Sequence, residues 1–329
     1  MKNYLLEQNF DFIVCGAGSS GSVVAARLAE QEKASVLLIE AGSSYSGPEV
    51  TEPSQWPMNL GSERDWAFEG EPNPHLNGRR LPLSMGRGLG GGSSINVMVW
   101  ARGHQSDWDY FAAEAGDPAW GYESVLGYYR RIENWQGKPD SLRRGSGGPV
   151  YVAQPAAPQP IANATLSAAS QLGIHEFESP NGNMMESAGG ISIAELRING
   201  GRRESVYDSY IRPRHYYPNL KILTNALVSR LILNGSKVVG IEVVVEGQLR
   251  RFYAGCEVIL SMGAVNTPKV LMQSGIGPQR ELQAQGIKVV NHLPGVGQNY
   301  QDHVAFGCTW EYRQPQVIGG GGCETTLYW

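Results

Sequence analysis

The pattern of apolar residues near the start of the chain predicts a strand, a helix and a second strand in close succession. Residues 10–15 form a short apolar run rich in strand-forming residues, and residues 35–39 form another. Between these runs, residues 20–31 are rich in alanine and place apolar side chains at helical spacing. Because two buried strands joined through a helix run parallel, this order predicts a βαβ unit in an α/β fold with a parallel sheet.

The strand pattern weakens after this unit and returns in the second half of the chain. Residues 43–85 are rich in Pro, Gly, Asn and Ser, and predict an irregular excursion. Residues 221–235 and 237–245 alternate or cluster apolar side chains, and residues 256–262 form a further apolar run. These three runs predict a small antiparallel meander that feeds a buried strand. A last strand is predicted over residues 305–312.

A glycine motif lies between the first predicted strand and the helix. In Gly16-Ala17-Gly18-Ser19-Ser20-Gly21, the first glycine permits a tight turn and the second lets the backbone approach a pyrophosphate. Gly21 lets the helix and the strand pack closely, and Ser19 lies where the helix begins. Because a helix N-terminus presents free N–H groups, this turn predicts a site for the phosphates of a dinucleotide.

An acidic residue completes the motif. Glu40, followed by Ala41, ends the second predicted strand about 20 residues after the last glycine of the motif. A carboxylate at this position accepts hydrogen bonds from ribose hydroxyls and disfavours a 2′-phosphate, which argues against NADP. NAD and FAD both remain compatible with the motif.

A second, denser glycine cluster occupies residues 86–103, with the sequence GRGLGGGSSINVMVWARG. Small residues such as Gly91 and Gly92 let the backbone lie against a large flat ligand, and Asn96 is placed to hydrogen-bond to it. A flexible glycine loop is the alternative interpretation. The apolar residues 97–99 that follow directly argue against a mere linker.

Composition narrows the class of protein. The 329 residues are 41% hydrophobic and 18% charged, which is typical of a globular protein, and the net charge of −4 with scattered Lys and Arg gives no basic patch for nucleic acid or an anionic membrane. The four cysteines show no ligand or framework spacing, so neither a disulfide framework nor a metal site is expected. With no leader-like start and no long apolar run, we expect a cytoplasmic protein without a membrane span.

Two long stretches make the chain recognisable. Residues 86–109 resemble the first signature of the glucose-methanol-choline (GMC) oxidoreductase family, and residues 263–277, GAVNTPKVLMQSGIG, resemble the second. Residues 65–72, 219–233 and 293–303 are also similar to the family, so the resemblance runs over nearly the whole chain. It implies a three-layer, Rossmann-like FAD/NAD(P)-binding α/β domain and part of an α+β substrate-binding lobe.

The resemblance also implies a division of the chain. Residues 1–155 and 212–305 would form a discontinuous FAD-binding domain. Residues 156–211 and 306–329 would form a partial substrate-binding domain, with its C-terminal remainder missing.

Carried over position by position, the resemblance implies which residues bind FAD. Gly16, Gly18, Ser19 and Gly21 would hold the pyrophosphate, and Glu40 with Ala41 the adenosine ribose. Gly91 and Gly92 would line the pyrophosphate and the isoalloxazine. The residues nearest the flavin ring would be Asn96, Val97, Met98 and Val99. Val228 would contact the adenine through its backbone. Some members tether FAD through a histidine at the position of Ile95, so here the FAD is expected to be non-covalent.

The activity that the resemblance implies is that of an FAD-dependent alcohol oxidase or dehydrogenase. Hydride passes from a primary or aromatic alcohol to flavin N5, and an aldehyde forms. The family's catalytic base is a histidine in the C-terminal third, which we expect beyond Trp329, so no catalytic residue is assigned here and the isolated chain is expected to be inactive. His303, after Asp302, is interpreted as structural.

Other functions remain open on the same scaffold. One is an FAD-containing hydroxynitrile lyase-like enzyme, and a light-driven decarboxylase is a more remote one. Another is a catalytically incomplete FAD-binding fragment that needs a second polypeptide carrying the C-terminal half.

Overall fold

The computed structural model describes residues 8–314 and 321–328. Contacts divide the chain into two compact units, which are described separately. Unit 1 comprises residues 1–45, 60–94 and 206–315, and unit 2 comprises residues 46–59, 95–205 and 316–329. These units are defined by contacts alone, and the predicted division into an FAD-binding and a substrate-binding domain stays a prediction.

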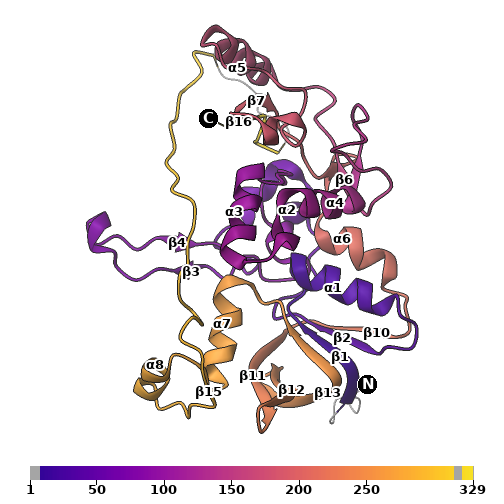
Figure 1. Cartoon of the computed structure of the whole chain (residues 1–329), viewed down its shortest axis with the longest axis vertical. Helices are drawn as coiled ribbons and strands as arrows, with labels where there is room; N and C mark the ends of the chain where they lie inside the picture. Colours follow the sequence, from indigo (N-terminus) through magenta and orange to yellow (C-terminus); the bar gives the residue numbers. More distant parts are fainter. Residues whose placement is uncertain (1–7, 315–320, 329) are drawn as a thin grey trace. The chain divides into compact units, whose positions relative to one another are not determined.

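Unit 1 is built on a six-stranded sheet with the strand order β10-β2-β1-β13-β12-β11 (Figure 1). Its strands are β1 (Gln8–Cys15), β2 (Val36–Ile39), β10 (Leu220–Leu223), β11 (Ala226–Asn234), β12 (Lys237–Val245) and β13 (Gln248–Leu260). The first four in spatial order run parallel, and β12 and β11 are antiparallel to their neighbours. The predicted βαβ unit is therefore confirmed, with α1 (Ser19–Ala29) as its helix.

The long strand β13 belongs to both parts of the sheet. Its first half pairs antiparallel with β12, and its second half pairs parallel with β1 up to Cys15 and Leu260. The predicted meander that feeds a buried strand is thus confirmed in outline. One part of it is wrong, because Leu220–Leu223 forms the separate parallel strand β10 beside β2. Asn225 adopts a left-handed φ of +53° and ends that strand before β11 begins.

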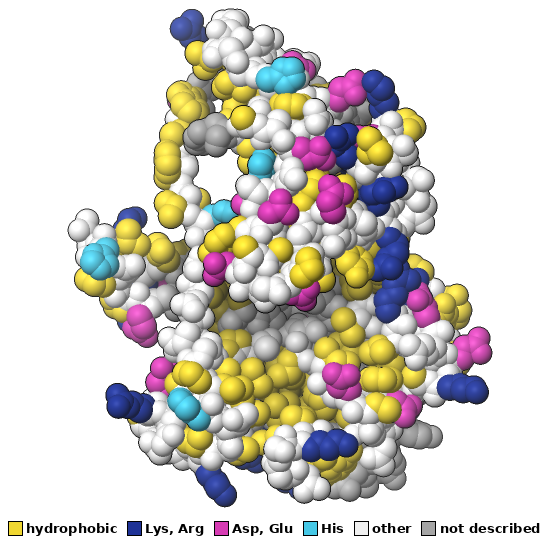
Figure 2. Space-filling view, viewed as in Figure 1, with side chains coloured by type: hydrophobic (Ala, Val, Ile, Leu, Met, Phe, Trp, Pro, Cys, Tyr) yellow, Lys and Arg dark blue, Asp and Glu magenta, His cyan; other side chains and the backbone are white. Residues whose placement is uncertain are grey.

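The parallel strands are covered on both faces, which gives the three predicted layers. Ile13, Cys15 and Ile39 pack into one cluster with residues of the meander and with Val270 of helix α7 (Gly263–Gln273). Because side chains alternate along a strand, the fully buried Val14 faces the opposite side. Helix α1, with buried Ala25, Ala26 and Ala29, lies along β1 and β2, and packs against α6 (Val206–Tyr210). Figure 2 shows hydrophobic side chains gathered in the lower part of the view, where Figure 1 labels α7 and β11–β13.

Shorter elements complete unit 1. They are the strand pairs β3 (Phe68–Glu69) with β4 (Pro82–Leu83) and β14 (Ile276–Gly277) with β15 (Asn291–His292), the helix α8 (Gln279–Ala284) and the 3-10 turn η3 (Gly91–Ser94). The strand predicted over residues 305–312 is absent. Within this range the side chains of Phe306 and Trp310 are 87% and 83% exposed, so they do not pack into a core among the described residues.

Unit 2 is assembled from short elements. Its helices are α2 (Pro48–Thr51), α3 (Gln105–Ala115), α4 (Tyr122–Ile132) and α5 (Pro160–Gln171). Its strands pair two by two: β5 (Glu133–Trp135) with β6 (Val150–Val152), β7 (Gly190–Ile193) with β16 (Thr325–Tyr328), and β8 (Ile198–Asn199) with β9 (Arg202–Arg203). In the part of the chain that the structure describes, no helix has the length and apolar character to cross a bilayer.

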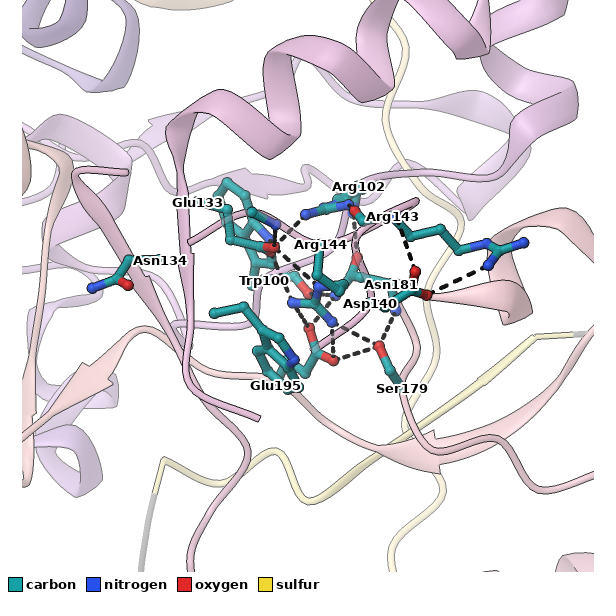
Figure 3. A network of polar contacts seen from close by, with 12 residues as sticks. Trp100, Arg102, Glu133, Asn134, Asp140, Arg143, Arg144, Ser179, Asn181 and Glu195 are labelled. Atoms are coloured by element: carbon teal, nitrogen blue, oxygen red, sulfur yellow. Dashed lines mark hydrogen bonds and ion pairs between the residues drawn. The ribbon is translucent and has the colours of Figure 1, made fainter. Parts of the chain in front are cut away.

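A buried network of charges holds unit 2 together (Figure 3). The Arg144 guanidinium lies between the carboxylates of Glu133 and Glu195, with closest N···O distances of 2.8 and 2.7 Å. Ser179 and Asn181 also donate hydrogen bonds to Glu195, at 2.6 and 2.8 Å. A buried charge is tolerated only when it is paired. Here the Arg144 guanidinium is shared by both carboxylates, and Glu133 also forms an ion pair with the buried Arg102.

Candidate functional site

A cavity of about 790 Å³ lies within unit 1. Its walls come from the turn between β1 and α1, the end of β2, residues 84–92, the start of β11, and the segment that joins β13 to α7. The volume falls within the range of about 300–1,000 Å³ that is typical of small-molecule and cofactor sites. These segments meet because the carboxyl ends of parallel strands lie at one edge of a sheet.

The geometry of the β1–α1 turn requires glycine at two of the three glycine positions of the motif. Gly16 has a φ of +96°, and a Cβ there would lie 2.4 Å from the carbonyl oxygen of Ser261. A Cβ on Gly21 would lie 1.8 Å from the carbonyl oxygen of Gly16. Both positions therefore exclude any side chain, as the motif predicts.

Gly18 has a different role. It precedes α1 in an extended conformation, and a Cβ there would meet no protein atom closer than 3.8 Å. No side chain caps α1, and its first turn holds no acidic residue, so the helix N-terminus keeps its partial positive charge. Gly16, Gly18 and Ser19 all line the cavity. The space beside Gly18 and the uncapped helix end together suit an anionic group.

Glu40 connects three segments of the cavity wall. Its carboxylate accepts hydrogen bonds from the backbone N–H groups of Ala17 at 3.0 Å, Gly42 at 2.9 Å and Gly88 at 3.0 Å. Burial raises the pKa of this carboxyl group, and the backbone donors, with the N–H of Ala41 among them, act in the opposite direction. A carboxylate has about four acceptor positions, so most are already taken by the protein. Glu40 and Ala41 both line the cavity.

The glycine cluster turns back on itself against the β1–α1 turn. Gly91 has a φ of +53°, and a Cβ there would lie 2.7 Å from Cα of Gly18. The N–H of Gly90 donates to the carbonyl of Ala17 at 2.8 Å. A Cβ on Gly92 would meet nothing within 4 Å, and both Gly91 and Gly92 line the cavity. The cluster thus forms a close-packed cradle that remains open on one side.

A further part of the wall contains Val228 and residues to which the sequence analysis assigned no individual contact. Residues 226–229 of β11 line the cavity together with residues 260–270 of the β13–α7 segment. Ser274, at the end of α7, accepts the N–H of Leu231 through its hydroxyl at 2.8 Å and so fixes α7 to β11. In the sequence, this part of the wall corresponds to the stretch GAVNTPKVLMQSGIG. That stretch indicated the family resemblance but did not predict which of its residues line a cavity.

Asn96, Val97, Met98 and Val99 belong to unit 2. The Asn96 carbonyl oxygen accepts hydrogen bonds from the N–H of Met98 at 3.1 Å and from Arg203 at 2.9 Å. Met98 adopts a φ of +63° and is buried. Their predicted position beside a flavin ring stays a prediction.

Histidine does not line this cavity in the described chain. His104 caps α3 and contacts the carbonyl of Ser187 at 2.8 Å, whereas His303 is exposed, with its N–H bonded to Asp302. Within residues 8–314 and 321–328, no group of three or more His, Cys, Asp or Glu side chains could hold a metal ion.

Comparisons with known proteins agree with this geometry. A family profile described as GMC oxidoreductase matches residues 10–305. Oxygen-dependent choline dehydrogenase of Brucella anthropi is 39% identical over 310 residues, which is 94% of this chain and 55% of that protein. The protein of the same name from Rhizobium johnstonii is 39% identical over 298 residues, 90% of this chain and 53% of that one.

Solved structures give the same result. Pyridoxine 4-oxidase from Mesorbium loti matches with a TM-score of 0.83 and 35% identity over 87% of this chain and 56% of that chain. A fungal aryl-alcohol oxidase matches with a TM-score of 0.77 and 25% identity, covering 88% of this chain and 52% of the other. The predicted Rossmann-like α/β fold class is confirmed. The chain spans about half the length of the relatives that it matches.

Proposed function

Because this chain belongs to the GMC oxidoreductase family, we propose that it is the FAD-binding portion of an enzyme that oxidises an alcohol to an aldehyde. The observation that carries the proposal is the convergence, in one cavity, of the uncapped α1 N-terminus, the Glu40 carboxylate and the glycine cradle. Bound FAD supplies a hydride acceptor, which the side chains of a protein lack.

Different residues of the cavity are assigned to different parts of the dinucleotide. We assign the pyrophosphate to the α1 N-terminus beside Gly16, Gly18 and Ser19, where free N–H groups and the helix dipole favour negative charge. Gly91 and Gly92 allow the backbone to approach the same group. Gly21 contributes by packing α1 on the turn, since its Cβ would overlap the Gly16 carbonyl oxygen.

We assign the adenosine end to the part of the cavity wall formed by the end of β2 and the start of β11. The free acceptor position of Glu40 takes a ribose hydroxyl beside Ala41, and the Val228 backbone contacts the base. Asn96, Val97, Met98 and Val99 are assigned to the flavin ring, on the family resemblance alone. Ile95 offers no nucleophile for a covalent link, so the FAD is held without a covalent bond.

The class of substrate follows from the relatives. Their names refer to choline, pyridoxine and aryl alcohols. We therefore propose a small primary or aromatic alcohol as the substrate. We also propose a cytoplasmic location, as expected from the sequence. We place the proton-accepting histidine on a segment that corresponds to the uncovered part of these relatives, either in the same protein or in a second polypeptide.

FAD binding is tested with the purified chain and a Gly18→Ala variant. The nearest protein atom to a Cβ at Gly18 is 3.8 Å away, so the fold accepts alanine, while the methyl group occupies the space assigned to the pyrophosphate. We expect a flavin absorption spectrum for the wild-type chain and at least a tenfold weaker FAD affinity for the variant. Gly127→Ala, on an open position of α4, is the control. A wild-type chain that takes up no FAD would contradict the proposal.

The place of catalysis is tested by intact mass under denaturing conditions, combined with anaerobic reduction of the flavin by alcohols. If the 35.8 kDa chain is accompanied by a second polypeptide, bleaching of the flavin by an alcohol is expected. Flavin that stays oxidised with every alcohol in that complex would argue against an alcohol-oxidising enzyme.

A further inference from the structure

One buried polar side chain on the cavity wall has no assigned role. Asn266 lies in α7, is only 7% exposed and lines the cavity. Its carboxamide forms no hydrogen bond with any described residue, whereas Thr267 in the same helix and Ser274 at its end bond to the backbone of Met262 and Leu231. A carboxamide has two donor hydrogens and an acceptor oxygen, and a ligand in the cavity can supply the partners that the described residues do not.

The position of Asn266 on α7 shows which part of the cavity it serves. Asn266 and Val270 are four residues apart and therefore share one face of the helix. Val270 packs into the same core cluster as Val228 of β11, and Ser274, one turn further on, is bonded to β11 through Leu231. The face that carries Asn266 thus runs along β11, where residues 226–229 line the cavity.

The first turn of α7 is less suited to an anion than that of α1. The N–H of Met262 is already satisfied by the hydroxyl of Thr267 at 3.1 Å. An amide offers a donor and an acceptor side by side. This pair is complementary to a nucleobase edge, and asparagine binds adenine in this way through the 6-amino group and an adjacent ring nitrogen.

We propose that the Asn266 carboxamide hydrogen-bonds to the edge of the adenine ring and makes the cavity selective for an adenine dinucleotide. The inference rests on the proposed function, in which this cavity holds FAD with its adenosine end against β11. Val228 then contacts the base through the backbone, and Asn266 reads the 6-amino group. Asn266 is a specificity residue for cofactor binding and touches no reacting atom.

The test compares two ligands and two proteins. The ligands are FAD and the analogous dinucleotide of purine riboside, which lacks the 6-amino group. The proteins are the wild-type chain and Asn266→Leu, with dissociation constants measured by the quenching of flavin fluorescence. We expect the wild type to bind FAD about tenfold more tightly than the analogue, because one hydrogen bond to the base is lost. In Asn266→Leu, FAD affinity falls about tenfold and the two ligands bind equally.

The unfolding temperature of the ligand-free protein separates a binding role from a structural one. Because the Asn266 carboxamide has no hydrogen-bond partner among residues 8–314 and 321–328, Asn266→Leu should unfold at the same or a higher temperature without ligand. Asn266→Ala is the second variant, so that the result does not depend on the bulk of leucine. Gln283→Leu removes an amide from an exposed position of α8 outside the cavity wall, and should change FAD affinity less than twofold.

The outcomes distinguish this inference from the proposed function. If the wild-type chain does not bind FAD, the proposed function fails. If it binds FAD but both Asn266 variants bind it equally well, or still discriminate against the analogue, the role of Asn266 is wrong and FAD binding stands. A lower unfolding temperature of both ligand-free variants would show a structural role instead.

Discussion

The Glu40 carboxylate accepts the backbone N–H of Gly88 at 3.0 Å, although the two residues lie 48 positions apart in the sequence. The same oxygen accepts the N–H of Gly42, and the other oxygen accepts that of Ala17. One side chain thus fixes the β1–α1 turn, the end of β2 and the glycine cradle relative to one another. An acid that the motif assigns to a ribose is also the residue that assembles the site.

This relationship predicts an effect on stability as well as on binding. Replacing Glu40 with Gln removes the charged acceptor and presents an N–H₂ group to backbone donors. Hydrogen bonds to a charged group contribute about 1.5–3 kcal/mol, so we expect the free energy of unfolding to fall by about 2 kcal/mol. FAD affinity should fall as well. Urea unfolding of the ligand-free chain measures the first effect.

Glu71→Gln is the matched control, because Glu71 is a highly exposed carboxylate and its change should stay within about 0.5 kcal/mol. If Glu40→Gln weakened FAD binding without lowering stability, the assembling role would be wrong and the ribose contact alone would remain.

The two adjacent glycines of the cradle should respond differently to alanine. Gly91→Ala forces a side chain onto a positive φ and against Cα of Gly18, so we expect a loss of about 1–3 kcal/mol in stability. Gly92 has space for a methyl group, so Gly92→Ala should leave the ligand-free chain stable and lower FAD affinity. Thermal unfolding and FAD titration of both variants check this pair. Equal stabilities would show that the close contact with Gly18 is not required.

The sequence predicted the first half of this site because its signals are local. A strand, a glycine turn, a helix and an acid follow one another within residues 10–40, and each has its own backbone requirement. The wall around Asn266 gave no such signal, since its contacts depend on the docking of α7 against β11. Likewise, residues 220–223 have the same apolar pattern as the meander, and only their pairing with β2 separates them from it.

Acid should weaken unit 2 through Glu186. The Arg143 guanidinium donates to both oxygens of Glu186 at 2.8 Å and holds the pKa of this carboxyl below its usual value. The folded state therefore binds fewer protons than the unfolded state. The resulting stabilisation is complete above the ordinary carboxyl pKa and is lost as the pH falls through the folded-state value.

We expect Glu186→Gln to lower the free energy of unfolding by about 1 kcal/mol at pH 7. Between pH 5 and pH 3, the variant should lose about 1 kcal/mol less stability than the wild type. Glu114→Gln, at an exposed position of α3, should reproduce the wild-type curve. Urea midpoints measured at several pH values provide the test, and parallel curves for Glu186→Gln and the wild type would contradict the assignment.

The buried network of Figure 3 predicts a large effect from a single change. Arg144→Met removes the guanidinium between Glu133 and Glu195, and only Glu133 keeps an ion pair within the network, with Arg102. Breaking a buried pair from one side costs about 3–5 kcal/mol, so this variant should be strongly destabilised. Arg130→Met, at an exposed position of α4, is the control and should differ little from the wild type. A loss below about 1 kcal/mol for Arg144→Met would show that the carboxylates find other partners.

The position of β13 in the sheet has a consequence for how the protein reaches its native state. Cys15 pairs with Leu260, so the two turns that follow these residues come together only after most of the chain has emerged from the ribosome. Pairings between such distant residues form slowly, because a long loop must close first. Until then β1 presents an open edge on the side that β13 later occupies, which is a site for wrong pairing. The pairing that completes the cavity therefore also closes the open edge of β1 against wrong partners.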